Sequence, residues 1–343
     1  LSPMVVNAAI FRDAYQARNP AVALPKVELL KKLGWRYTLA LQNRAYAAVQ
    51  RQDLREISDI SDALLRRGVI LEEATALMNL MELNPSTRKV VVAKLAKYPD
   101  WRPSYLERVY KMQDLRQIKA RGKVVSDLFQ MGAGLDRSEI YPTLKIMIAS
   151  GQTKTAYDLW LQHSNMKALP LNDPHFLSAW RMHSDPLADM PFEWNLSNGA
   201  GNWAEVVSKK DENNGKPVLR LNWDRSGAPL LLSQQTVMVN QFNRLVISGR
   251  QLSEGLLKNF RFSLDCPTGS QVFRNVIRVT KTRIELAPND PLPCETPVFS
   301  ISGNPEAGTV SSSRSPFGSA DPLQLELRYI QLLPASSSLR PAG

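Results

Sequence analysis

Over the first half of the chain, apolar residues recur every three or four positions, which is the spacing of helices that bury one face. Two such stripes follow each other, with Gln52 and Asp53 in the turn between them and Gly68 just past the second. A glycine at that place commonly ends a helix. The stripes comprise Tyr37, Leu41, Ala45 and Val49, and then Ile57, Ile60, Leu64 and Leu65. The pattern predicts two helices that form a hairpin.

Short helices joined by tight turns continue toward His163. Asn84-Pro85, Pro99 and the Gly132-Ala133-Gly134 stretch mark three of the breaks between them. A succession of short helices and turns is typical of a helical solenoid, in which each hairpin packs on its neighbours. We therefore expect an α-α superhelix of helical hairpins over residues 1–168.

Four prolines punctuate residues 169–190 and the first position beyond, which predicts a linker there. After it, apolar and polar residues alternate, as in Leu219-Arg220-Leu221-Asn222-Trp223. Such alternation marks strands with one face in a core and one in water. Strands are expected at 204–207, 218–223, 230–239, 245–249, 259–266, 276–286, 298–302 and 323–333. They predict an antiparallel β-sandwich or jelly roll over residues 191–335, followed by a disordered tail at 336–343.

The positive charge of the chain is concentrated in the helical half. Of the net charge of +11 in 343 residues, +9 belongs to residues 1–186 and +2 to the remainder. A basic surface favours acidic polysaccharide, nucleic acid or anionic lipid. However, no dense run of Lys and Arg occurs, and a solvated helical surface explains the excess equally well. We expect no nucleic-acid partner, because aromatic residues are not interleaved with basic clusters.

The only two cysteines, Cys266 and Cys294, both fall in the β half. They form either one disulfide, which would place the protein in the periplasm or outside the cell, or two buried thiols. No apolar run is long enough to span a bilayer. The first eleven residues lack the features of a signal peptide. Since the chain starts with Leu1 rather than Met, we leave open a removed signal or anchor, which would be the only membrane attachment.

Familiar catalytic and metal-binding signatures are missing from the chain. The histidines, His163, His175 and His183, lie at the end of the helical half, the last two near Asp173 and Asp185. Histidines and capping aspartates of a linker explain this grouping better than a metal site does. The acids Asp211, Glu212 and Asp224 fall in or beside turns, where acids are common. We therefore expect a protein without catalytic activity, metal or cofactor.

Three tryptophans, Trp194, Trp203 and Trp223, open the β half, and none follows them. Sugar-binding surfaces use aromatic faces for the C–H groups of the ring and polar side chains for the hydroxyls. Trp223 alternates in phase with Leu219 and Leu221, which indicates a core position. The predicted glycan-binding residues are Trp194, Trp203, Arg220, Asn222, Asp224, Arg225, Gln234 and Gln235.

The helical half resembles tetratricopeptide repeats over residues 27–165. The residues that carry the resemblance are Trp35, Tyr37, Ala45, Ala48 and Ala74, and then Tyr141, Leu144, Gly151, Ala156 and Leu159. Gly34 and Gly68 match the repeat period of 34 residues. Gly151 does not keep that period, so the repeat register departs from the family pattern.

The β half is similar to jelly rolls of the carbohydrate-binding-module type over residues 191–333. The segments that carry this resemblance are 191–196, 219–223, 232–239, 245–250 and 262–266. Together the two halves resemble helical-repeat plus jelly-roll proteins found with bacterial exopolysaccharide systems. The resemblance implies that Cys266 and Cys294 are paired and that the protein is periplasmic.

The leading hypothesis is a non-catalytic accessory protein of the bacterial cell envelope that acts in exopolysaccharide synthesis or export. Its helical repeats would hold a protein partner and its β-sandwich would bind polysaccharide. One alternative is a purely structural adaptor that binds no glycan. Burial of all three tryptophans of the β half would favour it. The other alternative is a glycan hydrolase or lyase with a cleft between the domains.

Overall fold

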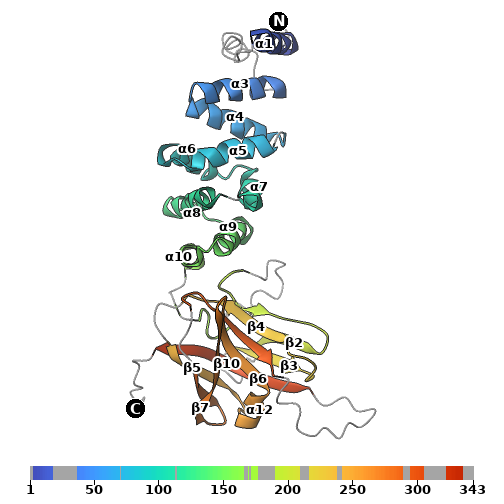
Figure 1. Ribbon diagram of the computed structural model, residues 1–343, viewed down its shortest axis with the longest axis vertical. Coiled ribbons are helices and arrows are strands. Elements are labelled where there is room, and N and C mark those ends of the chain that lie inside the picture. Colours follow the sequence, from blue (N-terminus) through green and yellow to red (C-terminus); the bar gives the residue numbers. More distant parts are fainter. Residues whose placement is uncertain are drawn as a thin grey trace. The chain divides into compact units, whose positions relative to one another are not determined.

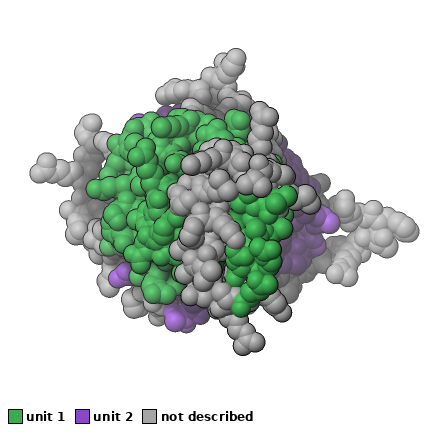
Figure 2. Space-filling model, turned by 90° about the horizontal axis from the view of Figure 1, so that it is seen from above, with its two compact units in different colours: residues 1–163 green, residues 164–343 purple. Residues whose placement is uncertain are grey.

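The computed structural model describes residues 3–17, 37–69, 71–112, 114–165, 169, 171–176, 190–208, 216–237, 242–288, 294–304 and 322–334. The chain forms two compact units, residues 1–163 and 164–343 (Figure 2). Helices make up the first unit and antiparallel strands dominate the second (Figure 1). The expected fold class, α followed by β, is confirmed. The predicted tail at 336–343 lies outside the described residues.

The first unit is a succession of short helices, and its first hairpin is the predicted one. The helices are α1 (Pro3–Ala17), α3 (Thr38–Gln50), α4 (Leu54–Arg66), α5 (Leu71–Glu82), α6 (Pro85–Leu95), α7 (Arg102–Glu107), the 3-10 helix η2 (Arg108–Lys111), α8 (Leu115–Gln130), α9 (Arg137–Ala149) and α10 (Thr153–Ser164). The side chain of Asp53 caps α4, and Gly68 after it has a φ of +64°. Helix α4 packs on α3 and α5, and α8 packs on α5, α6 and α9.

Buried ion pairs join neighbouring helices inside this unit. Arg44 of α3 contacts Glu56 of α4, Arg121 of α8 contacts Glu82 of α5, and Arg102 of α7 contacts Glu139 of α9. The shortest N–O distances are 3.1, 2.9 and 2.8 Å, in that order. Because a charge buried without a partner is costly, each pair ties one helix to a specific neighbour.

The Arg121–Glu82 pair is the most deeply buried, with side chains 0% and 1% exposed. The hydroxyl of Tyr105 donates a hydrogen bond to Glu82, and Arg121 also donates to the side chain of Asn79 at 2.9 Å. Burial, with the neighbouring carboxylate of Glu82, raises the pKa of Tyr105 well above its usual value. Tyr105 therefore stays protonated and serves as a fixed hydrogen-bond donor.

The second unit is built from ten described strands. They are β1 (Asn195–Leu196), β2 (Asn202–Ser208), β3 (Pro217–Trp223), β4 (Leu230–Gln235), β5 (Phe242–Arg250), β6 (Phe260–Cys266), β7 (Gly269–Val279), β8 (Arg283–Pro288), β9 (Val298–Gly303) and β10 (Leu323–Pro334), with the short helix α12 (Glu254–Lys258) before β6. Neighbours are antiparallel, in the order β1-β4-β9-β6-β7-β8-β5-β10-β3-β2. All eight predicted strand regions contain strand structure.

Strand β7 belongs to both sheets of the sandwich. Its residues 269–272 pair with β6, whereas residues 273–279 pair with β8. The two ends of the strand order also lie close together, because β2 at one end contacts β1 and β4 at the other. The inward-facing side chains of both sheets form one apolar core, in which Leu221, Trp223, Phe262, Phe299 and Leu325 are buried.

Residues 171–176, which we predicted as part of a linker, are instead part of the β unit. Leu171 and Phe176 are buried in its core, and Ile330 of β10 donates a backbone hydrogen bond to the carbonyl of Pro174. Pro174 and Pro191 lie outside regular helices and strands, as predicted, whereas Pro170 and Pro186 lie outside the described residues. Prolines do not show whether an irregular segment packs, because packing depends on what lies against it.

Cys266 and Cys294 form a disulfide that ties the end of β6 to the segment before β9, with Cα atoms 6.0 Å apart. The pairing implied by the resemblance is confirmed. A structural disulfide indicates an oxidising compartment, either a periplasm or the outside of the cell. Among the described residues, none of the helices combines the length and apolar character that crossing a bilayer requires.

Replacing Arg121 by Met should lower the free energy of unfolding of the helical unit by about 3–5 kcal/mol, because Glu82 would remain buried without its cation. The double variant Arg121→Met with Glu82→Leu should recover much of the loss. The exposed Arg66, which pairs with Asp62, provides the control, because Arg66→Met should cost about 1 kcal/mol or less. Urea unfolding followed by far-ultraviolet circular dichroism measures all three. Equal losses for Arg121→Met and Arg66→Met would contradict the assigned burial.

Reducing the disulfide should lower the stability of the β unit by about 3–4 kcal/mol, the loop-entropy value for a separation of 28 residues. Thermal unfolding of the full chain with and without reductant measures the change. The double variant Cys266→Ala with Cys294→Ala should show the lowered stability in both conditions. A reductant effect in that variant would point to a cause other than the disulfide.

Candidate functional site

The three tryptophans of the β half have different surroundings. Trp194 and Trp223 are each 1% exposed, whereas Trp203 is 42% exposed. The indole of Trp223 donates to the carbonyl of Ser226 and packs against Gly303, where an added Cβ would lie 2.7 Å from the ring. The core position predicted for Trp223 is confirmed, and Trp203 alone of the three presents its ring to solvent.

Trp194 and Gln234 are not available to a glycan, which corrects their assignment to a binding site. Both hold residues 171–176 in place. The indole of Trp194 donates to the carbonyl of Asp173 at 2.8 Å, and the amide of Gln234 exchanges two hydrogen bonds of 2.9 Å with the backbone of Asn172. Gln235 is half-buried, and its amide donates to the carbonyl oxygens of Thr296 and Pro297. These groups stabilise the fold.

The outer surface of β2, β3 and β10 brings together three of the predicted glycan-binding residues. Two rows of residues run across these strands, Trp203 with Asn222 and Gln324, and Glu205 with Arg220 and Glu326. We call this surface the Trp203 face. It joins residues that are more than 100 positions apart in the sequence, since β10 lies beside β3.

Ion pairs hold the second row of the Trp203 face in one arrangement. The guanidinium of Arg220 donates to Glu205 at 2.9 Å and to Glu326 at 3.0 Å. In the first row, Asn222 is only 4% exposed. Its Nδ2 has no hydrogen-bond partner in the described part of the chain. The face therefore combines an exposed ring with a fixed charged row, whereas the amide N–H groups of Asn222 lie beneath the surface, out of reach of a ligand.

Asp224 and Arg225 lie in the turn that follows β3. The backbone N–H and hydroxyl of Ser226 both donate to the carboxylate of Asp224, and the hydroxyl's bond, followed by the backbone's, lowers the pKa of this exposed group. Gly201, with a φ of +83°, passes so close to this carboxylate that a Cβ there would clash with it. Asp224 therefore fixes the turn, and Arg225, with a φ of +70°, is exposed on it.

Among the described residues, the histidines and acids considered as metal ligands or catalytic groups do not form a cluster. Burial, with the nearby charge of Arg137, lowers the pKa of His163 in α10. His175 packs edge-on against Tyr329 of β10. His183, Asp185, Asp211 and Glu212 lie outside the described residues. Within the part of the chain that the structure describes, no group of three or more potential ligands could hold a metal ion.

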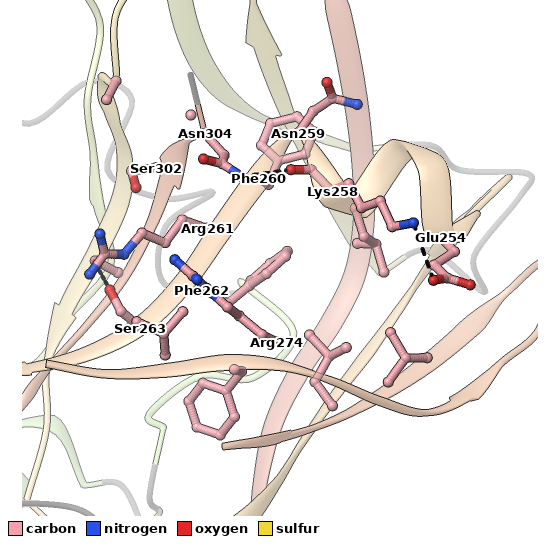
Figure 3. A pocket seen from close by; sticks show the side chains of 18 of the residues that line it. Glu254, Lys258, Asn259, Phe260, Arg261, Phe262, Ser263, Arg274, Ser302 and Asn304 are labelled. Atoms are coloured by element: carbon pink, nitrogen blue, oxygen red, sulfur yellow. Dashed lines mark hydrogen bonds and ion pairs between the residues drawn. The ribbon is translucent and has the colours of Figure 1, made fainter. Parts of the chain in front are cut away.

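A second candidate surface is a pocket of about 840 Å³ beside helix α12, formed by parts of β6, β7 and β9 (Figure 3). We call it the α12 pocket. Its lining includes Arg261, Arg274, Ser263, Ser300 and Asp265. Figure 3 shows Arg261 and Ser263 on one side of the pocket and the ion pair of Lys258 with Glu254 on the other. Its volume lies within the range of about 300–1,000 Å³ that is usual for small-molecule sites.

The α12 pocket is not predicted from the sequence, because the hairpin that forms it is not. One strand is predicted over 276–286, whereas β7 starts at Gly269 and is joined to β6 by only Pro267 and Thr268. A turn of two residues next to a glycine is a recognisable hairpin signal. In this hairpin, Arg261 and Arg274 lie the same number of residues from the turn, one on each strand.

Comparisons with known proteins add little to this geometry. Neither a family model nor a curated protein matches the chain. A solved structure of the CBM32-1 and CBM32-2 domains of ZmpB from Clostridium perfringens, in complex with GalNAc, aligns with 65% of this chain and 51% of that one. The identity is 11% and the TM-score is 0.18. The chain thus spans about half the length of that structure, and an overlap this low supports no inference about fold or function.

The unequal burial of the tryptophans has a measurable consequence. Trp223→Ala should destabilise the β unit by about 3–5 kcal/mol, because it leaves a cavity in the core. Trp203→Ala should cost about 1 kcal/mol or less, because its ring packs on one side only. Chemical denaturation of the full-length variants measures both. A large loss in Trp203→Ala would show that the ring is structural.

Proposed function

We propose that the β unit binds polysaccharide through the Trp203 face and that the protein is a non-catalytic accessory protein. The observation that carries the proposal is the exposed indole of Trp203, since the other residues of the two rows that form the Trp203 face are polar or charged. An exposed tryptophan at a strand position costs favourable burial that a core position would supply. A ligand that stacks on the ring would recover it.

Polysaccharide fits this surface better than an apolar ligand does. The C–H groups of a sugar ring pack on an aromatic face, while its hydroxyls need hydrogen-bonding partners beside that face. Gln324 supplies an exposed amide in the same row as Trp203, and the ion pairs of Arg220 keep the neighbouring row from moving. A surface that is held rigid before binding loses little entropy when the ligand arrives.

In this proposal the helical unit holds a protein partner. Helix α3 supports this role. Tyr46 lies seven positions after Leu39 and three before Val49, so the three residues share one face of the helix, and each is more than 40% exposed. Helical solenoids commonly bind partners through such surfaces. The disulfide suits a periplasmic setting. We therefore place the protein in the bacterial cell envelope, in exopolysaccharide synthesis or export, with tetratricopeptide-like repeats as its helical part.

A purely structural adaptor remains the second candidate function. The burial of Trp194 and Trp223 favours it, because both of these tryptophans serve the core. The adaptor alternative does not explain why the ring of Trp203 is exposed. Glycan binding by the full-length protein therefore distinguishes the two candidates.

The test is binding of the full chain to a panel of neutral and acidic bacterial polysaccharides, measured by affinity electrophoresis or calorimetry. We expect saturable binding, which Trp203→Ala should weaken by about 2 kcal/mol, or roughly 30-fold in Kd. Tyr46→Ala, which removes a ring of similar exposure from α3, is the matched control and should bind as the unmodified chain does. Absence of binding to every polysaccharide, or binding unaffected by Trp203→Ala, would favour the adaptor.

A further inference from the structure

The α12 pocket contains two arginines that have no counter-ion within the described part of the chain. Arg261 of β6 and Arg274 of β7 both line it, and both are exposed. Neither guanidinium has a hydrogen bond or ion pair with any residue that the structure describes. A guanidinium presents five N–H donors in a planar arrangement that matches a carboxylate.

The acids of the same pocket are already engaged. Glu254 pairs with Lys258 across one turn of α12 at 3.5 Å. Asp265 accepts hydrogen bonds from the hydroxyls of Ser300 at 2.6 Å and Ser263 at 3.0 Å. The neutral hydroxyls leave the negative charge of Asp265 in place, so Lys258, Arg261 and Arg274 against Glu254 and Asp265 give the lining a net charge of +1.

The β6–β7 hairpin explains why the two arginines share a wall. In the paired part of the hairpin, Ser263 lies opposite Val272. Arg261 and Arg274 each lie two residues further along, on the same face as this pair. Beyond this pair β7 leaves β6 to pair with β8, so the two arginines line the opening between the strands, where an anion could be bound by both.

The rest of the lining offers neutral hydrogen-bonding groups of the kind that recognise hydroxyls. The amide N–H groups of Asn259 and Asn304 donate to carbonyl oxygens of α12, so these side chains offer their Oδ1 atoms as acceptors. Ser302 lies opposite Arg261 in the pairing of β9 with β6. A phosphate or sulfate needs only the cations, whereas a sugar acid uses both sets of groups. We propose that the α12 pocket binds the carboxylate of a uronic acid residue in an acidic polysaccharide, with Arg261 and Arg274 on the carboxylate and the serine and asparagine side chains on the hydroxyls.

The inference deepens the proposed function, because it names the class of glycan, but it places that glycan at a second site. Calorimetry with the full chain tests it with two probes, a uronic acid oligosaccharide and the same oligosaccharide with its carboxylates reduced to alcohols. We expect the acidic probe to bind and the reduced probe to bind at least tenfold more weakly, since charge-assisted hydrogen bonds to the arginines are lost.

Single variants Arg261→Gln and Arg274→Gln should each raise the Kd for the acidic probe about tenfold. The matched control is Arg278→Gln, which removes an exposed arginine from the same strand outside the pocket and should leave the Kd unchanged. Unchanged thermal unfolding of all three variants would confirm that they fold. Equal binding of both probes, equal loss in Arg278→Gln, or tighter binding of inorganic phosphate than of the acidic probe would overturn the proposal.

These experiments test the Trp203 face and the α12 pocket separately. Trp203→Ala should retain binding of the short acidic probe, and the double variant Arg261→Gln with Arg274→Gln should retain binding of a neutral polysaccharide. If the acidic probe does not bind while Trp203-dependent binding of polysaccharide persists, only the α12 pocket is wrong. If the acidic probe binds while no polysaccharide depends on Trp203, the Trp203 face is wrong and the pocket stands.

Discussion

The β unit depends on a single strand that is shared by its two sheets. The first residues of β7 pair with β6 and the later ones with β8, so the two layers are joined by a continuous backbone. Since each sheet buries one face, joining them along one edge encloses the apolar side chains of both in one core. The crossing also separates the strands around residues 272–274, and the α12 pocket lies there.

The two candidate sites differ in what the surrounding structure has already satisfied. On the Trp203 face, the charges are paired, since Arg220 contacts two carboxylates. What is left exposed is the apolar ring of Trp203. In the α12 pocket the opposite holds, because the rings of Phe260 and Phe262 are buried while the guanidinium groups of Arg261 and Arg274 contact no acid among the residues that the structure describes. A surface of the first kind favours stacking, and a pocket of the second kind favours an anion.

The helical unit solves a different problem, which is how short helices choose their neighbours. An apolar stripe packs against many partners with similar energy, whereas a buried arginine is tolerated only beside its acid. The pairs Arg44–Glu56, Arg121–Glu82 and Arg102–Glu139 each join two particular helices. We regard them as the interactions that set which helix lies against which, at a cost in stability that apolar pairs would avoid.

The sequence alone determined which elements form and in what order. The helical spacing around Leu41 and Ile60 and the alternation from Leu219 to Trp223 depend only on neighbours along the chain, so helices, strands and the core position of Trp223 could be predicted from them. Contacts between distant segments could not be predicted in this way. Trp194 and Trp203 look alike in sequence, but residues 171–176 and Phe299 pack on the first and bury it, whereas the second lies on the edge strand β2 and is exposed. Likewise, the pairing of Cys266 with Cys294 and the presence of Arg261 and Arg274 in one pocket were decided by the tertiary structure, because the neighbours of a strand residue are set by strand order and register.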